Sequence, residues 1–313
     1  MPMIVTVTPN PALDKTAVVP GFTLGRIFRV AEPQWLPGGK GFNVARSLRV
    51  LGLEALAVAP LAGHIGAMVR DLAQAEGLQL DCVWFAGETR TCQSIIDPTT
   101  GGVTELYETG SPLPGEVWEQ IIALVRKRLP AAQAVTVSGG FPRGVPLDGL
   151  RRIVELVQAA GVPTLLDTYG EHLLHALAAQ PALVKCNQHE ASEIVGDSIH
   201  DHAAALAAAR TIQGRGACEV VITLGAQGAV GIDRFGHTFG WGVPSVHSIS
   251  AVGSGDAFLA GLVAEQTRGQ PLRCAARYGV AVGAANTVRA GAGMFERVTA
   301  NALLKDVPAL TVG

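Results

Sequence analysis

The chain has 313 residues, 48% of them hydrophobic, so it can bury a substantial core in one large domain or two small ones. Its formal net charge is −2, with acids and bases mixed along the sequence. This balance argues against nucleic-acid-binding and membrane-surface proteins, which are broadly basic. No apolar run approaches the ~20 residues that cross a bilayer. Five cysteines without close pairs favour reduced thiols, and MIVTVTPN is typical of a buried strand rather than a signal peptide, so we expect a cytoplasmic protein.

Short β-branched runs alternate with longer helical patterns along the chain. The sequence predicts strands at 3–8, 54–63, 134–140, 163–168 and 182–187, and a strand, turn and strand over 219–232. It predicts helices at 43–52, 66–77, 147–161, 172–180 and 257–267. Such alternation is typical of an α/β protein with a mainly parallel sheet covered by helices on both faces. Chemistry is then expected at the loops that follow the carboxyl ends of the strands.

Two strand-rich stretches, 15–36 and 89–109, interrupt this alternation. The first holds TAVV and RIFRVAEPQW with no helix between them, and the second predicts a β-hairpin around DPTTGG. They could be two surface hairpins, or they could form one small sheet that covers an edge of the main domain. The pattern alone leaves both possibilities open.

The stretch SAVGSGDAFLAG at 250–261 places an acid where a helix is expected to begin. The first amides of a helix lack partners within the helix and carry the positive end of its dipole, so Gly253, Ser254 and Gly255 could bind an anion such as a transferring phosphate. Asp256 would stand beside that anion and could accept a proton from an attacking hydroxyl. The alternative is that Asp256 is simply a helix cap.

A second glycine cluster, LPGGKGFNVARSLRVLG, spans 36–52. It is not a P-loop, because GxxxxGK followed by Ser or Thr is absent. Bare backbone at Gly38 and Gly39 lets a polyol approach closely, and Asn43 can both donate to hydroxyls and accept from them. Asp14, in TPNPALDKT, could accept from sugar hydroxyls, although an isolated Asp there is also typical of a turn.

A third cluster, VKCNQHEASE at 184–193, places Asn187 and Glu190 three residues apart, on one face of a helical turn. Their oxygens suit a Mg²⁺ ion held through water beside nucleotide phosphates, and Lys185 adds a positive charge nearby. A zinc motif beginning at His189 is excluded because its second histidine is missing. The strand–glycine turn–strand ITLGAQGAVGI could hold the phosphates or ribose of a nucleotide, while GVAVGAANTVRAG suits either helix packing or an adenine slot.

These clusters, in this order, resemble the PfkB/ribokinase family of sugar kinases. The resemblance spans nearly the whole chain, through TPNPALD, GGKGFNVAR, TRT, SGGFPRG, KCNQHE, TLGAQGA, VGSGDAFLAG and AANT. TPNPALD with GGKGFNVAR looks like the branch of 1-phosphofructokinases and tagatose-6-phosphate kinases. The resemblance implies one ribokinase-like α/β domain over 1–313, with both strand-rich stretches forming a small β-sheet lid. It also implies a homodimer formed through the lid.

The resemblance assigns roles to individual positions. Asp256 matches the catalytic base, with Gly253, Ser254 and Gly255 forming the anion hole. Three further groups follow from the resemblance. The acceptor-binding group is Asp14, Gly38, Gly39, Lys40, Asn43 and Ser138, and the nucleotide-binding group is Lys185, Asn187, Thr223, Gly225, Gly228 and Asn286. Asn187 and Glu190 form the group associated with Mg²⁺. There are two departures from the family pattern: Cys186 replaces a usual proline, and Gly140 stands where relatives often have serine, which removes a possible hydroxyl contact with the substrate.

The implied activity is ATP-dependent phosphorylation of a ketohexose phosphate. Arg90 and Lys40, within matching motifs, are expected to bind the phosphate of the acceptor; Arg29 is a further candidate, although it and Arg26 could instead face solvent on the lid. Fructose 1-phosphate is the first choice, and tagatose 6-phosphate and fructose 6-phosphate are close alternatives. A non-catalytic regulator that binds nucleotide and sugar phosphate is the alternative of another class. A dehydrogenase is excluded because no GxGxxG follows the first strand.

Overall fold

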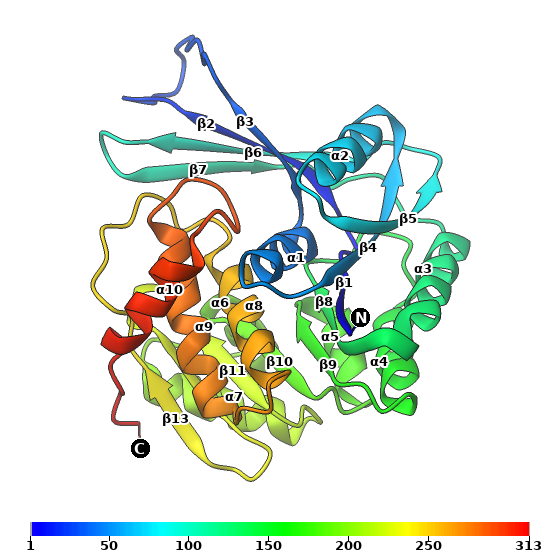
Figure 1. Ribbon diagram of the computed structural model, residues 1–313, viewed down its shortest axis with the longest axis vertical. Coiled ribbons are helices and arrows are strands. Elements are labelled where there is room, and N and C mark those ends of the chain that lie inside the picture. The colour runs from blue at the N-terminus through cyan, green and yellow to red at the C-terminus, as the bar shows by residue number, and fades with distance from the viewer. Residues whose placement is uncertain (1, 313) are drawn as a thin grey trace.

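The computed structural model describes residues 2–312 and contains a large and a small β-sheet (Figure 1). The large sheet has the strand order β13-β12-β11-β10-β9-β8-β1-β4-β5 within these residues, and all neighbouring strands are parallel except those that involve β12 and β13. Its strands are β1 (Met3–Val7), β4 (Ala55–Ala62), β5 (Gln79–Phe85), β8 (Ala132–Ser138), β9 (Thr164–Asp167), β10 (Leu183–Asn187), β11 (Val220–Thr223), β12 (Ala229–Ile232) and β13 (Thr238–Trp241).

Helices cover both faces of the large sheet, as the alternating pattern predicts. One face carries α1 (Lys40–Val50), α2 (Gly63–Ala75), α8 (Ser254–Gln266), α9 (Leu272–Thr287) and α10 (Arg297–Leu303). The other face carries α3 (Gly115–Arg128), α4 (Gly149–Ala159), α5 (Gly170–Leu177), α6 (Gln188–Val195) and α7 (His202–Gly214). No helix among residues 2–312 is both long enough and apolar enough to span a membrane.

The strands of the large sheet are apolar on both sides because each side faces a separate core. In β1, Ile4 packs into the core beneath α1 and α8, whereas Val5 and Val7 pack into the core on the opposite face. Strand side chains alternate between faces with a period of two, so a strand buried on both sides reads as a continuous apolar run. This is why the parallel strands could be located in the sequence.

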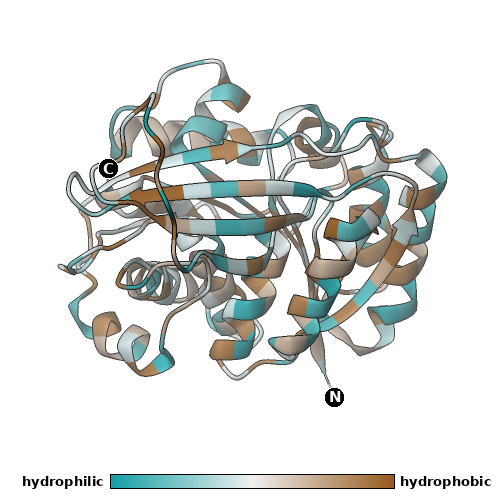
Figure 2. Ribbon diagram, turned by 90° about the horizontal axis from the view of Figure 1, so that it is seen from above, coloured by the Kyte–Doolittle hydropathy of each residue, from teal (hydrophilic) through white to brown (hydrophobic). Residues whose placement is uncertain are grey.

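The two strand-rich stretches form one small sheet, which confirms the predicted lid. Its order is β3-β2-β6-β7, with β2 (Ala12–Val18), β3 (Gln34–Gly38), β6 (Arg90–Asp97) and β7 (Gly102–Tyr107). The central pair, β2 and β6, is parallel, so it joins segments far apart in the sequence. Viewed from above, the strands of this sheet extend across the molecule and alternate between polar and apolar residues (Figure 2). The lid is wider than the predicted stretches, since β2 begins at Ala12 and β3 ends at Gly38.

Candidate active site

The turn before α8 presents unpaired amides beside a carboxylate. Gly253 has φ +75°, a left-handed conformation that favours glycine, and a Cβ atom there would overlap Ala292. The amides of Ser254 and Asp256 donate to carbonyls within the turn at 3.1 Å, which corrects the prediction that Ser254 offers its amide to an anion. The amides of Gly253 and Gly255 have no acceptor among the described residues. These two N–H groups therefore form the available anion-binding pair.

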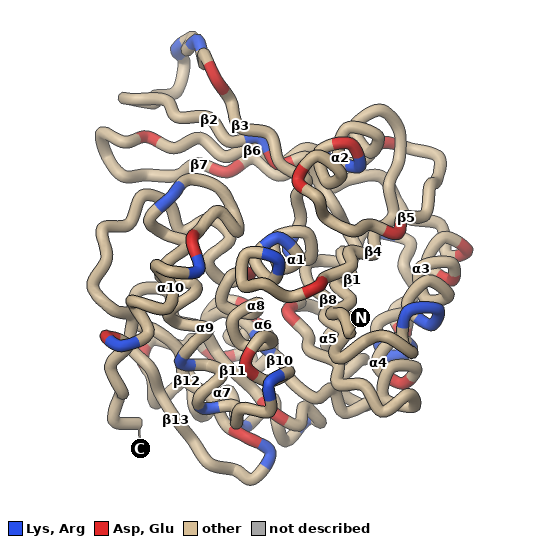
Figure 3. Tube along the Cα trace, in the orientation of Figure 1, with Lys and Arg blue, Asp and Glu red and all other residues tan. Residues whose placement is uncertain are grey.

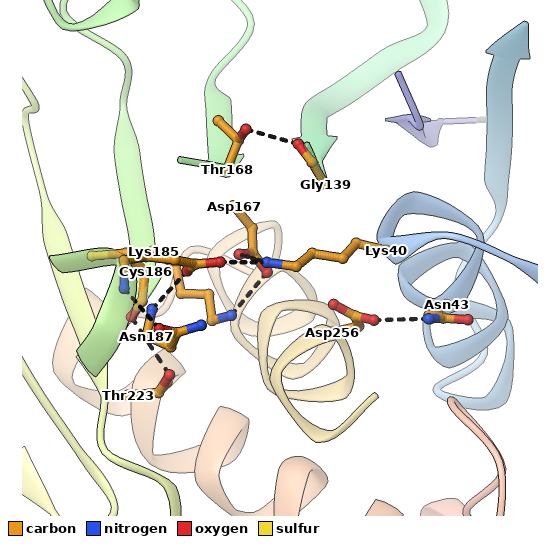
Figure 4. A network of polar contacts seen from close by, with 11 residues as sticks. Lys40, Asn43, Gly139, Asp167, Thr168, Lys185, Cys186, Asn187, Thr223 and Asp256 are labelled. Carbon is orange, nitrogen blue, oxygen red and sulfur yellow. Dashed lines mark hydrogen bonds and ion pairs between the residues drawn. The ribbon is translucent and has the colours of Figure 1, made fainter. Parts of the chain in front are cut away.

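Asp256 faces the second glycine cluster rather than capping its own helix. Its side chain is buried, and Asn43 on α1 donates a 2.8 Å hydrogen bond from Nδ2 to its Oδ2 (Figure 4). Burial and the nearby negative charge of Asp167 raise the pKa of Asp256 to about 7, although Lys40 and Lys185 act in the opposite direction. A carboxyl with this pKa exchanges a proton near neutral pH, as a general base must.

Arg46 fixes the orientation of Asn43, and sequence reasoning missed it. Its guanidinium donates to Asn43 Oδ1 at 3.0 Å, so the amide is turned to present Nδ2 to Asp256. The same group donates to the carbonyls of Pro37 and Ala292 at 2.7 and 2.9 Å, and it pairs with Glu76 at 2.7 Å. Arg46 thus connects the lid strand β3, helix α1 and the loop after α9. Its position one helical turn after Asn43 in GFNVARSL was the available indication.

Asp167 is the second residue that sequence reasoning missed, and it lies between two lysines. Its oxygens accept from Lys40 Nζ at 3.1 Å and from Lys185 Nζ at 2.8 Å, and its side chain is fully buried (Figure 4). Burial opposes its ionisation, but the two ammonium groups hold the pKa of Asp167 below its usual value. An aspartate at the carboxyl end of a buried parallel strand, as in PTLLDT, was the indication in the sequence.

Lys40 joins this group to the expected metal-associated motif. Its ammonium also contacts Glu190 Oε1 at 2.9 Å, and the two carboxylates raise the pKa of Lys40 against the effect of burial, so it stays charged. A Cβ atom built on Gly255 would lie 3.0 Å from Lys185 Nζ. The positive charge of Lys185 therefore lies directly against the amide turn of α8.

Asn187 and Glu190 form a capping box at the start of α6. Asn187 Oδ1 accepts from the Glu190 amide and Glu190 Oε2 accepts from the Asn187 amide, both at 2.9 Å. Both oxygens of Glu190 therefore already have partners, and within residues 2–312 no group of three or more His, Cys, Asp or Glu side chains could hold a metal. These residues do not fit direct protein coordination of Mg²⁺. An ion held through water remains compatible with them.

The acceptor-side residues converge at the base of the lid. Gly38 leaves room for the Asp14 carboxylate, which a Cβ atom at residue 38 would overlap. Gly39, which precedes α1, has φ +96°, a conformation open to glycine. Burial raises the pKa of Asp14 to about 6, although Arg46 and Arg90 lower it. The carboxylate is thus a strong acceptor for a sugar hydroxyl once ionised.

Arg90 lies at the base of the lid, where β6 begins. Its guanidinium donates to the carbonyls of Asn10 and Glu108 at 3.1 and 3.2 Å, while its buried Nε has no acceptor in the described part of the chain. Ser138 is fully buried at the end of β8, and its hydroxyl has no partner among residues 2–312. The structure does not bring Arg29 to this group: Arg90 pairs with Ala12 at the start of β2, whereas the connection that holds Arg29 leaves from the other end of that strand, and Arg29 is exposed. Figure 3 shows basic residues at the far end of that connection.

A cavity of about 440 Å³ opens on the other side of the α8 turn. It is lined by Thr223, Gly225 and Gly228, as predicted, and also by Ser254, Gly255 and apolar residues of α9. Asn286 does not line it: its amide is fully buried, donating to the Val252 carbonyl and accepting from the Gly293 amide at 2.8 Å each. Its predicted nucleotide contact is therefore replaced by support of the turn before α8.

Comparison with known families accounts for this geometry. Residues 12–297 match the pfkB family carbohydrate kinases. The chain belongs to the pfkB family. It is therefore a kinase that transfers a phosphoryl group to a sugar hydroxyl, and its large and small sheets are those of the ribokinase-like fold.

Relatives of this pfkB kinase carry several names. It is 33% identical to an ATP-dependent 6-phosphofructokinase isozyme 2 of Mycobacterium tuberculosis, over 95% of this chain and 87% of the relative. It is also 33% identical to a 1-phosphofructokinase of Xanthomonas campestris, over 83% of each chain. The crystal structure of phosphofructokinase-2 from Escherichia coli in complex with potassium has a TM-score of 0.89 at 30% identity, covering 97% of this chain and 99% of that one.

Proposed function

We propose that this kinase transfers the terminal phosphoryl group of ATP to a hydroxyl of a ketohexose phosphate. Fructose 1-phosphate, giving fructose 1,6-bisphosphate, is the first choice, with tagatose 6-phosphate and fructose 6-phosphate as alternatives. The observation that carries the proposal is the placement of Asp256. Its carboxylate stands between the unpaired amides of the α8 turn and Asn43 of the acceptor cluster.

The reaction follows from this placement. The acceptor hydroxyl attacks the γ-phosphorus in line, its proton passes to Asp256, and the bond to the β–γ bridging oxygen breaks, releasing ADP. The amides of Gly253 and Gly255 stabilise charge on the transferring group, and each such donor is worth about 2.7–4 kcal/mol in comparable sites. Lys40 and Lys185 add fixed positive charge beside the same turn. Mg²⁺ enters with the nucleotide as part of the substrate.

An arginine at the base of the lid supports a phosphorylated acceptor. Arg90 donates only to carbonyls, so no carboxylate neutralises its guanidinium through an ion pair in the described chain. Guanidinium groups bind phosphate through paired hydrogen bonds. Lys40 adjoins Gly38 and Gly39, but its ammonium already pairs with Asp167 and Glu190, so Arg90 is the main candidate partner for the acceptor phosphate.

The decisive experiment measures ADP release with fructose 1-phosphate, tagatose 6-phosphate, fructose 6-phosphate, free fructose and ribose. We expect kcat/KM to be at least about tenfold higher for one of the phosphorylated ketohexoses than for free fructose, because the Arg90 guanidinium then gains an anionic partner. Equal values for free and phosphorylated sugars would overturn the proposed acceptor class. Binding of nucleotide and sugar phosphate without ADP release would favour the non-catalytic regulator.

The pH profile tests Asp256 as the base. As a base it works only when ionised, so kcat/KM should rise with pH and level off above a pH of about 7, the raised pKa of Asp256. Asp14, with a pKa raised to about 6, should steepen the fall at lower pH. The measurement is kcat/KM from roughly pH 5 to 9 with both substrates varied. A profile that is flat between about pH 6 and 8 would contradict the role of Asp256.

The same proposal covers assembly and location. Apolar side chains on the lid, including Leu24, Ile27 and Leu106, are more than half exposed, which favours a homodimer formed through the lid. A structure of the Escherichia coli relative is described as a tetrameric inhibited form, so its assembly is not limited to two copies. The five cysteines are free in the structure, in keeping with a cytoplasmic enzyme that uses ATP. Sedimentation of the purified chain measures its assembly directly.

A further inference from the structure

The side chain of Tyr169 occupies the space beside Gly140, in the loop that follows β8. Gly140 follows β8, and a Cβ atom built on it would lie 2.5 Å from the hydroxyl oxygen of Tyr169. The Tyr169 ring also lies 6.0 Å from Lys40 Nζ. The residue is 43% exposed, and its hydroxyl makes no hydrogen bond with residues 2–312. A phenol therefore occupies the room beside Gly140 and has a free donor at the edge of the acceptor site.

Contacts on both sides of Tyr169 hold it in this place. Immediately before it, Thr168 donates from Oγ1 to the Gly139 carbonyl at 2.7 Å, and the Gly139 amide donates to the Asp167 carbonyl at 2.9 Å (Figure 4). Shortly after it, the His172 ring stacks on Phe141 with ring centres 4.3 Å apart. The loop after β8 and the start of α5 are thus joined, and the backbone of Tyr169 is fixed although its ring is partly exposed.

The surroundings of Gly140 indicate which ligand group the Tyr169 hydroxyl could contact. On one side, Gly139 approaches the side chain of Lys40: a Cβ atom at residue 139 would lie 3.8 Å from the Lys40 Cβ. On the other side, Pro142 lines the same small hollow as Arg90. Gly140, with the Tyr169 hydroxyl against it, therefore lies on a loop that contacts the stem of Lys40 at Gly139 and shares a hollow with Arg90 at Pro142.

We propose that Tyr169 is a specificity-determining residue whose hydroxyl donates a hydrogen bond to the phosphate group of the acceptor. This inference rests on the proposed function. In chains with serine at position 140, the side chain there could reach the same space; in this chain the donor comes from the start of α5 instead. A tyrosine hydroxyl is a donor of the right type for a phosphate oxygen, and such charge-assisted bonds are stronger than neutral ones.

The first test is Tyr169→Phe, which removes only the hydroxyl. We expect KM for the preferred ketohexose phosphate to rise about tenfold, with kcat, KM for ATP and the melting temperature nearly unchanged. Activity with the free ketohexose should not change, because it has no phosphate. Tyr278→Phe is the matched control, since the Tyr278 hydroxyl bonds Asn301 at 3.0 Å between α9 and α10. An unchanged KM in Tyr169→Phe would overturn the inference.

The second test exchanges the two positions. Gly140→Ser alone should raise KM, because its Cβ atom displaces the tyrosine ring. Combined with Tyr169→Ser, which empties that space, the serine hydroxyl at position 140 should restore KM to within about threefold of the wild type. If the increases in KM of the two single variants simply added in the double variant, the side chains at positions 140 and 169 would not share one space and one function.

A binding measurement separates this inference from the proposed reaction. The rise in melting temperature caused by each ketohexose phosphate reports binding without turnover. If the wild type binds a ketohexose phosphate but releases no ADP, the proposed catalysis fails, and a smaller thermal shift in Tyr169→Phe still supports the contact. If the wild type neither binds nor phosphorylates any of them, both proposals are overturned.

Discussion

Replacing Asp256 with asparagine is expected to lower kcat by about two to four orders of magnitude, which is the range that a positioned general base contributes. Asparagine keeps the size of the side chain but cannot accept the proton of the acceptor hydroxyl. KM for ATP should change little, because the cavity predicted to receive the nucleotide lies on the other side of the α8 turn. The measurement is kcat by ADP release at saturating substrates. Activity within tenfold of the wild type would exclude Asp256 as the base.

Folding of the same variant provides its control. The pKa of Asp256 is raised from 3.8 to about 7 in the folded chain, so the folded state loses stability from this group as pH rises between those values. Above pH 7 Asp256→Asn should therefore be at least as stable as the wild type, and the advantage should shrink at lower pH. Asp148→Asn is a matched substitution at the start of α4, where the side chain makes no cap hydrogen bond, and it should leave kcat unchanged.

Replacing Asp167 with asparagine is expected to cost about 3–5 kcal/mol of unfolding free energy, the usual effect of removing one partner from a buried ion pair. Lys185 is almost fully buried, and among the described residues Asp167 is its ion-pair partner, whereas Lys40 retains Glu190. The variant leaves the Lys185 ammonium uncompensated in the core. Urea unfolding at neutral pH measures the loss.

Asp81→Asn is the control for that substitution. Asp81 also pairs with a basic residue, accepting from Arg128 at 2.7 and 2.9 Å, but both side chains are partly exposed. Exposed pairs contribute about 0–1 kcal/mol, so the midpoint of this variant should move little. Equal losses of unfolding free energy for Asp81→Asn and Asp167→Asn would mean that burial of the ion pair does not explain the loss in Asp167→Asn.

Local sequence patterns were sufficient for much of the fold. Apolar runs such as ALVKCN and helical patterns such as NVARSLRVLG lie in β10 and α1, because burial on both faces of a parallel sheet leaves a continuous apolar stretch. The lid was different, since its central pair joins β2 to β6 across some seventy intervening residues. Pattern alone could not choose between two hairpins and one sheet, and the family resemblance made that choice.

Some residues of the candidate site could likewise be predicted from local motifs, whereas others depend on contacts between distant segments. Asp256 and Asn43 carry their chemistry in short glycine motifs, and the predicted acceptor and nucleotide clusters lie on either side of the α8 turn. Arg46, Asp167 and Tyr169 are different, because each contacts a group from another part of the chain: the Ala292 carbonyl, Lys40 and Gly140, respectively. Asn187 and Glu190 show the opposite case: their spacing suits a metal, yet the same spacing makes the capping box that occupies them.

By itself, the sequence determined the α/β class, the turn that begins α8 and the residue types available for phosphoryl transfer, because these depend on local periodicity and on glycine-rich motifs. Only the tertiary structure decided which amides of that turn are free, which lysines share Asp167 and what fills the space beside Gly140. The physical reason is that ion pairing, desolvation and close packing depend on distances between segments far apart in the chain, and these distances are set when the two sheets and their helices pack together.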